Sequence, residues 1–311
     1  AALSGCDAVH AAADAFKLFG LLRKTRRAVV HLHLYTALLP AVLACRAAGA
    51  PCVAHLHIPL RDWNARHRFA WRTAVRGANH ICGVAKDVLR SVGHSDGDGR
   101  ATLVPPPIPL PEPAPARPPH RPDSPFVVAG VGRLADQKDW PTLLRALPQV
   151  RQDVEKAGRT LRFLHAGGGE KKEEFHALVR SLDLTDVVDA RGAIPHAQVA
   201  EILDAADLFV LPSRFEGLGI APLEAMARGV PTVTADYPAA DDYIVGPPGA
   251  ETGRTFPRGD AAACAEQIRW HLRNPRESAA LGQRGRTFVA KNFIPAVTFG
   301  KLPAIYDSLA N

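Results

Sequence analysis

Short runs of apolar, often β-branched residues alternate with helical segments along most of the chain. In the first third, strand-like runs cover 28–34, 51–57, 79–84 and 101–104. The segments between them, 36–48, 61–76 and 86–92, are predicted to be helical. Strands that are separated by helices predict a parallel sheet with helices on both faces.

Proline interrupts this pattern between residues 105 and 125, where the sequence is PPPIPLPEPAPARPPHRPDSP. Proline has no N–H to donate within a central strand, and a proline-rich segment is stiff and extended. We therefore predict a first domain over 1–110, a linker over 111–125 and a second domain over 126–294.

A second alternating series follows the linker. Its predicted strands cover 126–131, 161–166, 187–190, 208–211 and 231–235. Its predicted helices cover 140–156, 171–182, 198–206, 220–228, 261–272 and 275–292. The expected fold is therefore α/β, with two Rossmann-like domains built on parallel sheets.

Composition narrows the classes of function without identifying one. The 311 residues suffice for two α/β domains, and the 47% of hydrophobic residues can form a sizeable core. The net charge of +7 suits an anionic ligand or an anionic membrane or polymer surface. With 6% aromatic residues and no basic run interleaved with aromatics, nucleic acid is not expected as a partner.

Cysteine usage and hydropathy favour a cytoplasmic protein. Cys6, Cys45, Cys52, Cys82 and Cys264 form no CxxC pair, and buried reduced thiols are expected. No apolar run is long enough to span a bilayer, and no secretory signal is visible. The basic surface leaves a peripheral contact with the inner membrane face as an option.

The strongest chemical signal is the segment EGLGIAPLE, from Glu216 to Glu224. Gly217 and Gly219 allow backbone N–H groups to approach a ligand closely. A helix that begins at Ile220 directs unpaired N–H donors toward the same space, which suits a phosphate or a polyhydroxyl group. Glu224, one turn into that helix, can bind a pair of hydroxyls. A capped helix with two surface glutamates is the simpler alternative.

The setting of these residues, LPSRFEGLGIAPLEAMARGVPTV, resembles the E-x7-E region of the family-4 glycosyltransferases, which have the GT-B fold of two facing Rossmann-like domains. The resemblance implies that Glu216 holds the transferred sugar near its 3- or 4-hydroxyl and that Glu224 holds the ribose of the nucleotide. It also implies that residues 295–311 form a helix that returns to the first domain. The other donor-binding residues that it implies in this segment are Gly217, Leu218, Gly219 and Ile220.

A second signal, GRLADQK from Gly132 to Lys138, follows the first strand of the second domain and is similar to the G-R-x4-K motif of that family. Ligands of α/β sheets bind at the carboxyl ends of the strands, where this segment lies. Arg133 and Lys138 are expected to neutralise the diphosphate as the sugar–phosphate bond breaks, in place of a metal ion. A solvated basic loop is the alternative.

Two weaker matches add residues to the expected donor site. Gly168, in the sequence AGGG, is similar to the family's glycine loop beside the nucleotide, although a simple turn gives the same pattern. Arg191, in the sequence RGAI, stands where the family's chain passes the base, and backbone contacts are expected there.

Two histidine pairs, His31 with His33 and His55 with His57, each lie on one face of a predicted strand, because residues i and i+2 point the same way. The family often has a histidine at the end of the first of these strands, close to the donor sugar. His33 is therefore expected to be catalytic, and His57 to be a second residue of the cleft. A zinc site of four histidines is the competing hypothesis, although no carboxylate or cysteine pair accompanies it. Histidines that are satisfied at strand ends are the simplest explanation.

The sequence departs from the family in two places. Residues 105–109, PPPIP, stand where many relatives carry an asparagine–glycine turn into the second domain. Residues 1–27 contain no glycine-rich loop after a first strand. About two βα units, on the order of 60 residues, are therefore expected to be missing from the start of the first domain.

These features predict a retaining hexosyltransferase that moves a sugar from a nucleoside diphosphate to a hydroxyl of a carbohydrate, lipid or small molecule. A UDP-sugar is the favoured donor and a GDP-sugar the alternative. No metal and no other cofactor are expected. Two alternatives stay open: an inactive nucleotide-sugar-binding or partner module, and a nucleotide-sugar epimerase of the same architecture.

Overall fold

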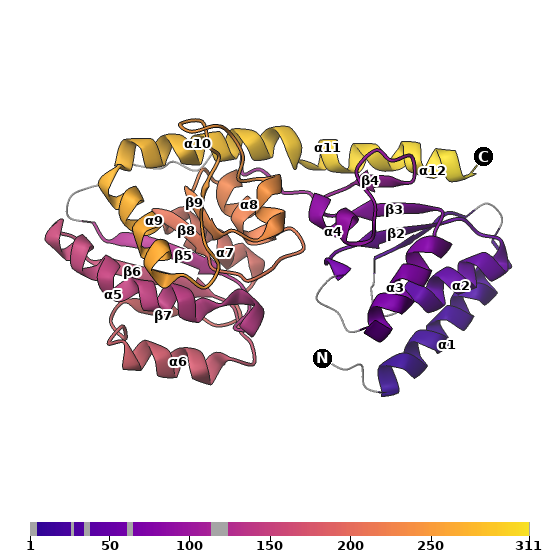
Figure 1. The fold of residues 1–311 in the computed structure, drawn as a ribbon, viewed down its shortest axis with the longest axis horizontal. Helices are drawn as coiled ribbons and strands as arrows, with labels where there is room; N and C mark the ends of the chain where they lie inside the picture. The colour runs from indigo at the N-terminus through magenta and orange to yellow at the C-terminus, as the bar shows by residue number, and fades with distance from the viewer. Residues whose placement is uncertain (1–4, 26–27, 34–37, 61–64, 113–123, 311) are drawn as a thin grey trace. The chain divides into compact units, whose positions relative to one another are not determined.

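The computed structural model describes residues 5–25, 28–33, 38–60, 65–112 and 124–310, with the side chains of all of these except 5–12 and 66. The chain divides into two compact units. Unit 1 contains Ala1–Pro107 and Pro295–Asn311, and unit 2 contains Ile108–Ile294. The chain therefore passes from one unit to the other twice (Figure 1).

Unit 1 is built on a four-stranded parallel sheet with the order β1-β2-β3-β4. Its strands are β1 (Val30–Leu32), β2 (Cys52–Leu56), β3 (His80–Gly83) and β4 (Ala101–Leu103). Its helices are α1 (Gly5–Leu22), α2 (Leu38–Ala48), α3 (Ala65–Gly77), α4 (Lys86–Ser91), α11 (Pro295–Thr298) and α12 (Leu302–Ala310). Helix α2 packs against both α1 and α3.

The C-terminal helix α12 covers part of this sheet. Ile305 packs into one buried cluster with Val53, Cys82 and Val104, and Tyr306 lies against the same cluster. Burial of an apolar side chain of this size contributes roughly 1.5–3 kcal/mol, so the helix and the sheet stabilise each other. The family resemblance implied one helix over 295–311. The structure instead has α11, a 3₁₀ turn and α12, with the poor helix former Gly300 in the turn.

Unit 2 contains a six-stranded parallel sheet with the order β10-β9-β8-β5-β6-β7. Its strands are β5 (Phe126–Val131), β6 (Leu161–Ala166), β7 (Val188–Ala190), β8 (Leu208–Leu211), β9 (Thr232–Ala235) and β10 (Arg254–Phe256). The chain extends the sheet from β5 through β6 to β7, and then returns to add β8, β9 and β10 on the other side of β5. The loops after β5 and β8 therefore leave adjacent strands where the order reverses, which is where open α/β sheets bind ligands.

Helices cover the sheet of unit 2 in two groups (Figure 1). They are α5 (Trp140–Lys156), α6 (Lys172–Ser181), α7 (His196–Ala205), α8 (Ile220–Ala227), α9 (Ala261–Arg273) and α10 (Pro275–Asn292). Helix α5 packs against α6 and α9, and α8 packs against α10. Helix α5 forms because its apolar residues recur every three or four positions, and those at 143, 147, 150 and 154 are buried.

The predicted α/β fold with two parallel sheets is confirmed. The strands at 126–131, 161–166 and 208–211 and the helices at 140–156 and 275–292 match residue for residue. Helix α1 and strand β10 were not predicted. Residues 34, 36–37, 61–64 and 113–123 of the predicted elements and linker lie outside the described residues. No helix among the described residues is long and apolar enough to cross a bilayer.

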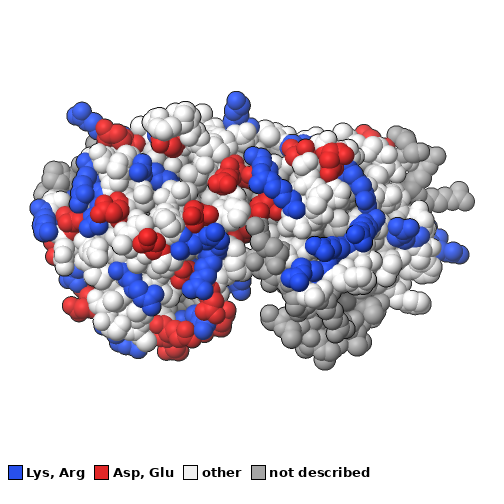
Figure 2. All heavy atoms as spheres, in the orientation of Figure 1, with Lys and Arg blue, Asp and Glu red and all other residues white. Residues whose placement is uncertain are grey.

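The two units differ in charge. Unit 1 has 15 Lys and Arg against 7 Asp and Glu, whereas unit 2 has 23 against 24. Figure 2 shows Lys and Arg side chains spread over the visible face of unit 1 with few acidic groups among them, whereas both signs alternate over unit 2. The excess positive charge of the chain therefore belongs to unit 1.

Candidate functional site

The residues that the sequence assigned to the donor site in unit 2 lie at the carboxyl edge of its sheet. Arg133 and Lys138 follow β5, Gly168 follows β6, Arg191 follows β7 and Glu216 follows β8. The segment Gly217–Ile220 leads into α8, and Glu224 lies within that helix. Residues that are far apart in the sequence are thus brought to one edge of one sheet.

Hydrogen bonds hold the loop after β5 in one conformation. The indole N–H of Trp140 donates to the carbonyl of Arg133 at 2.9 Å, and Nε2 of His165 donates to the carbonyl of Gly132 at 3.2 Å. Burial lowers the pKa of His165 to about 4, so its ring is neutral at pH 7. The loop is therefore ordered before a ligand binds, which reduces the entropic cost of binding. The side chain of Arg133 is exposed and has no hydrogen bond or ion pair within the part of the chain that the structure describes.

The glycines after β6 are required by the loop after β5. A Cβ atom on Gly167 would lie 1.9 Å from the carbonyl oxygen of Gly132, and one on Gly169 would lie 2.3 Å from that of Leu134. A Cβ atom on Gly168 would make only an ordinary contact at 3.4 Å. The glycine run is therefore more than a simple turn, because two of its members let two loops pass in backbone contact.

Glu216 is almost fully buried and joins the loops after β5 and β8. Its Oε1 accepts from Nζ of Lys138 and from Oγ of Ser213, each at 2.6 Å. The amide of Gln137 donates to the carbonyl of Phe215 at 2.9 Å, which fixes the backbone beside the carboxylate. A buried carboxylate is tolerated when it is paired and hydrogen-bonded in this way.

The two oxygens of Glu216 differ in what they can still accept. Oε2 has only a long contact of 3.4 Å with Gln137 among the described residues. This oxygen can therefore accept a hydrogen bond from a ligand hydroxyl. Lys138 has three N–H donors, so one bond to Glu216 leaves donors for an anionic ligand.

A tyrosine pair lies under the turn into α8. The hydroxyls of Tyr237 and Tyr243 are hydrogen-bonded to each other, and burial raises the pKa of both above the ordinary value, so both stay neutral. A Cβ atom on Gly219 would lie 2.9 Å from the first hydroxyl and 3.1 Å from the second, and the φ of this glycine is +92°. The sequence suggested that Gly219 serves the approach of a ligand. The structure adds that internal packing and a left-handed backbone also require glycine there.

Glu224 has a partner that the sequence did not indicate. Nε2 of His196 donates to Oε1 of Glu224 at 2.8 Å. The imidazole is 80% exposed, whereas the carboxylate is 18% exposed. A contact with so exposed a side chain contributes about 0–1 kcal/mol, so a ligand can displace the histidine at little cost.

A hollow of about 360 Å³ lies beside the glycine loop and the chain after β7. This volume is within the range of small-molecule sites, roughly 300–1,000 Å³. Both Gly168 and Arg191 line it, and Nε of Arg191 is 3.3 Å from the carboxylate of Asp189. Its remaining lining residues are Leu134, Gly167, Lys172, His176, Ala190, Gly192 and Ala193.

The sequence analysis missed several residues that build this site. Ser213 and Gln137 stand inside the stretches that carry the two motifs, and their ability to hydrogen-bond was the available signal. His196 and the tyrosine pair gave no signal, because their contacts depend on how the strands are ordered in the sheet.

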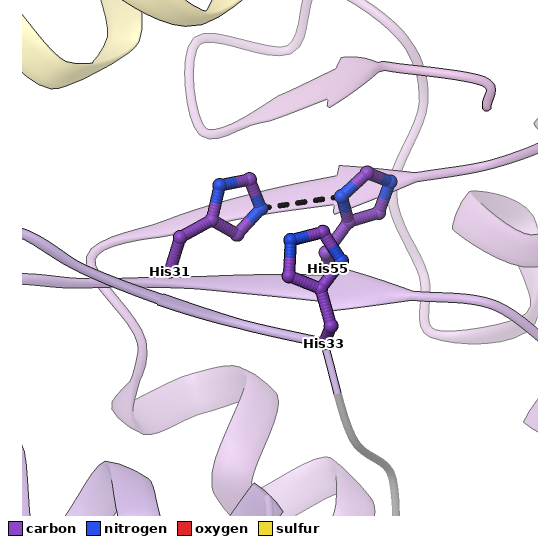
Figure 3. A group of neighbouring side chains, drawn as sticks. All are labelled: His31, His33 and His55. Carbon is purple, nitrogen blue, oxygen red and sulfur yellow. Dashed lines mark hydrogen bonds between the residues drawn. The ribbon is translucent and has the colours of Figure 1, made fainter. Parts of the chain in front are cut away.

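In unit 1, four histidines lie together at the carboxyl ends of β1 and β2. His31 and His33 come from β1 and the residue after it, and His55 and His57 come from β2 and the residue after it. Nε2 of His31 is 3.2 Å from Nδ1 of His55 (Figure 3). Nδ1 of His33 is 3.2 Å from Nε2 of His57. Both strands thus direct histidines at one place.

Burial keeps these imidazoles neutral. It is the main cause that lowers the pKa of His31 to about 4 and that of His55 to about 3, and it also lowers the pKa of His33 and of His57. The rings of His33 and His57 are exposed, and the expected role of these two residues stays a prediction.

Family models match both halves of the chain. The model described as "Glycosyl transferases group 1" matches residues 115–288, which is more than half of the chain. The model described as "Glycosyltransferase Family 4" matches residues 3–112.

Individual proteins are also similar. A GDP-mannose-dependent alpha-(1-6)-phosphatidylinositol monomannoside mannosyltransferase of Mycolicibacterium smegmatis is 30% identical over 55% of this chain and 44% of its own length. The alpha-maltose-1-phosphate synthase of the same organism is 34% identical over 70% of this chain and 61% of its own. The chain spans about half the length of the curated relatives it matches.

The fold resembles that of solved GT-B glycosyltransferases. The crystal structure of Anabaena HepE in complex with UDP aligns with a TM-score of 0.80 at 18% identity, over 94% of this chain and 82% of that one. At this identity the similarity concerns the fold alone.

Proposed function

Because the chain belongs to the glycosyl transferases group 1 family, we propose that it transfers a hexosyl group from a nucleoside diphosphate sugar to a hydroxyl with retention of configuration. The observation that carries the proposal lies at the reversal point of the unit 2 sheet. There Lys138 and Glu216 pair at 2.6 Å and join the two loops that follow adjacent strands. A cation for phosphate and an acceptor for sugar hydroxyls thus stand side by side.

Each donor group has an assigned partner in the proposal. The diphosphate contacts Arg133 and Lys138, which take the part that a metal ion has in other transferases. Oε2 of Glu216 accepts from the 3- or 4-hydroxyl of the sugar, and Glu224 accepts from the ribose after His196 is displaced. The base occupies the hollow beside Gly168 and Arg191. The N–H groups of Gly217–Ile220 face the diphosphate at the start of α8.

The proposed chemistry needs no carboxylate nucleophile. The bond between the anomeric carbon and the phosphate oxygen breaks while the acceptor oxygen attacks from the same face. The departing phosphate oxygen takes the acceptor proton, and its growing negative charge is stabilised by the two fixed cations. The family resemblance further implies that His33 is catalytic, with His57 as a second residue beside it.

A UDP-sugar is the proposed donor. HepE, which shares the fold, was crystallised with UDP, whereas the mycobacterial mannosyltransferase is named as GDP-mannose-dependent. A GDP-sugar is therefore the alternative. The proposed acceptor is a hydroxyl of a carbohydrate, lipid or small molecule.

We also propose a cytoplasmic location with a peripheral contact to anionic lipid. The four described cysteines are buried free thiols, which suits a reducing compartment. Unit 1 has the excess of Lys and Arg, and on α3 the side chains of Phe69, Arg72 and Arg76 are exposed. Apolar and basic groups on one helix favour binding at a membrane surface.

The proposal is tested by a thermal-shift panel of UDP, GDP, ADP and their common sugar conjugates. A ligand that binds only the native state raises the Tm by mass action. One nucleotide is expected to raise it in the wild type and in Arg180→Ala, an exposed arginine at the far end of α6, but not in Arg133→Ala. Release of nucleoside diphosphate that requires an acceptor then separates transfer from simple binding.

Three outcomes of the thermal-shift panel and the release assay would contradict the proposal. Donor binding without release of nucleoside diphosphate favours a binding or partner module or, if the bound sugar is converted to its epimer, an epimerase. Release of nucleoside diphosphate without an acceptor favours a hydrolase, in which water takes the sugar. No shift with any nucleotide, in a folded protein, shows that the chain does not bind a donor by itself.

A further inference from the structure

We propose that unit 1 contains a binding site for a divalent transition-metal ion of the zinc class, formed by the imidazoles of His31, His33 and His55. This inference goes beyond the proposed function, in which Arg133 and Lys138 of unit 2 neutralise the leaving group. His31 and His55 come from neighbouring parallel strands, whose pairing fixes their backbones, and His33 directly follows the first of these strands (Figure 3).

The spacing of the ring nitrogens suits such an ion. One nitrogen from each of the three rings lies within 4.8 Å of the other two. Nε2 of His31 and Nδ1 of His55 are 3.2 Å apart. In a tetrahedral site with metal–nitrogen bonds of about 2.0–2.1 Å, two ligand nitrogens are about 3.3 Å apart. Two of the ligands therefore already have nearly the separation that a shared ion requires.

The other nitrogens of these two rings are held by the protein. Nε2 of His55 donates to the carbonyl of Val104 at 2.9 Å, and a carbonyl can only accept. Nδ1 of His55 therefore carries the lone pair that faces His31. Nδ1 of His31 is 2.6 Å from the hydroxyl of Tyr306, which can accept or donate as required. Metal-bound histidines have this arrangement, in which an outer partner holds the nitrogen that does not bind the ion.

His33 completes the triad and gives the ion access. Its Nδ1 is 3.2 Å from Nε2 of His57, which leaves Nε2 as the nitrogen for the ion. Its ring stacks on that of His31 with centroids 4.3 Å apart, so binding of an ion requires this exposed ring to rotate until its lone pair points between the other two. The fourth position of a tetrahedral site then belongs to water, and His57 acts as a positioning residue.

The experiment uses the full chain without an affinity tag, stripped by a chelator and dialysed, and titrated with Zn²⁺ by calorimetry. We expect one ion per chain with a Kd below about 10 µM. Co²⁺ in place of Zn²⁺ should give the strong visible absorption of a tetrahedral complex. Because the readout is binding, it is independent of any transferase activity and of the donor site.

Three variants assign the site. His33→Ala, at an exposed position, should weaken binding by more than tenfold. Tyr306→Phe, which removes only a hydroxyl, should weaken it by roughly tenfold, as for other outer partners of metal-bound histidines. The matched control is His80→Ala, because His80 lies on β3 of the same sheet and is bonded to Thr102 instead. This variant should bind as the wild type does.

Two results would overturn the proposal. The first is the absence of stoichiometric Zn²⁺ binding by the folded wild type, which would leave the histidines as a hydrogen-bonded network only. The second is equal binding by the wild type and His33→Ala, or a cobalt spectrum without tetrahedral absorption, which would place any bound ion elsewhere.

Discussion

Unit 1 and unit 2 share the same alternation of parallel strands and helices, but they carry charge in different ways. Unit 2 is close to neutral, and many of its cations are paired, such as Arg228 with Asp204 at 2.6 Å and Arg151 with Asp186 at 2.8 Å. Unit 1 has about twice as many basic as acidic residues. The candidate anion site nevertheless lies in unit 2. Net charge is therefore a poor guide to a specific anion site, which depends on a few cations in fixed positions.

The carboxyl edges of the two sheets show the same contrast in detail. In unit 2 the edge carries a largely buried ion pair, Lys138 with Glu216. It also carries the loops after β5 and β6, which are in backbone contact with each other. In unit 1 it carries neutral imidazoles that are bonded mostly to one another. Charged groups that are fixed by pairing suit a charged donor, whereas neutral nitrogen donors suit a soft or borderline metal ion.

The largest effect should come from removing one fixed charge in unit 2. Glu216→Gln keeps the shape of the side chain but removes its charge, and should lower kcat by roughly 10²–10³-fold, as does the loss of other preorganised polar groups. Glu224→Ala should chiefly weaken nucleotide binding. Steady-state kinetics with the donor found by thermal shift measure both. Intact turnover in both variants would remove this assignment of the site.

The second prediction concerns the backbone contact between the loops after β5 and β6 of unit 2. Gly167→Ala places a methyl group 1.9 Å from the Gly132 carbonyl and should cost several kcal/mol of unfolding free energy. Gly168→Ala is the matched control, because its methyl group makes an ordinary contact at 3.4 Å. Denaturant unfolding compares the two variants. Equal losses in both would show that the backbone contact between the loops is not what requires glycine.

The third prediction concerns the stability of unit 2 at acidic pH. Burial lowers the pKa of His165 to about 4 and that of His271 to about 3, from 6.5. The unfolded chain therefore binds protons first as the pH falls. The stability of unit 2 is fully present above pH 6.5 and decreases between pH 6.5 and 4, by on the order of 3 kcal/mol for His165.

Urea unfolding at pH 7 and at pH 4.5 measures this loss. His165→Gln, which cannot titrate in this range, should lose less stability between the two values than the wild type does. The same slope in both proteins would show that other groups control the acid response.

The smallest effect should concern the surface of unit 1. Each arginine near an anionic membrane contributes about 1 kcal/mol, and salt screens the attraction. Arg72→Ala with Arg76→Ala should reduce sedimentation with phosphatidylserine vesicles a fewfold at low salt, whereas Arg180→Ala in unit 2 should not. Binding that is unchanged by these substitutions, or by salt, would contradict a role for the basic helix α3.

The parts of the fold that the sequence predicted well are those with local signals. Strands β5 and β8 are continuous apolar runs because both faces of a central parallel strand are buried. Strand β6 is apolar except for Arg162 and His165, and the bounds of all three strands were predicted residue for residue. The three-residue strand β10 is too short to give a pattern. The residues of helix α1 were assigned to no element, because the analysis of that region sought a glycine-rich loop and found none.

The contacts within the two sites depend on strand order, which local patterns do not contain. Lys138 meets Glu216 because β8 pairs with β5 although three helices and two strands separate them in the chain. The register pairs His31 with Val53, and His55, two residues further along β2, points to the same face of the sheet as Val53. His55 therefore lies diagonally next to His31. The motifs therefore identify the residue types of each site, whereas their contacts follow only from the order of the strands in the sheet.

The cover that α12 gives to the sheet of unit 1 has a consequence for synthesis on the ribosome. Strands β1 to β4 emerge before unit 2, but Ile305 and Tyr306, which pack on them, emerge only after it. Unit 2 is continuous in sequence and can fold in the interval, since domains generally fold as units during translation. Until translation reaches α12, the face formed by Val53, Cys82 and Val104 is open to chaperones and to aggregation. During the synthesis of unit 2, the nascent chain is therefore most vulnerable in the part of unit 1 that precedes it.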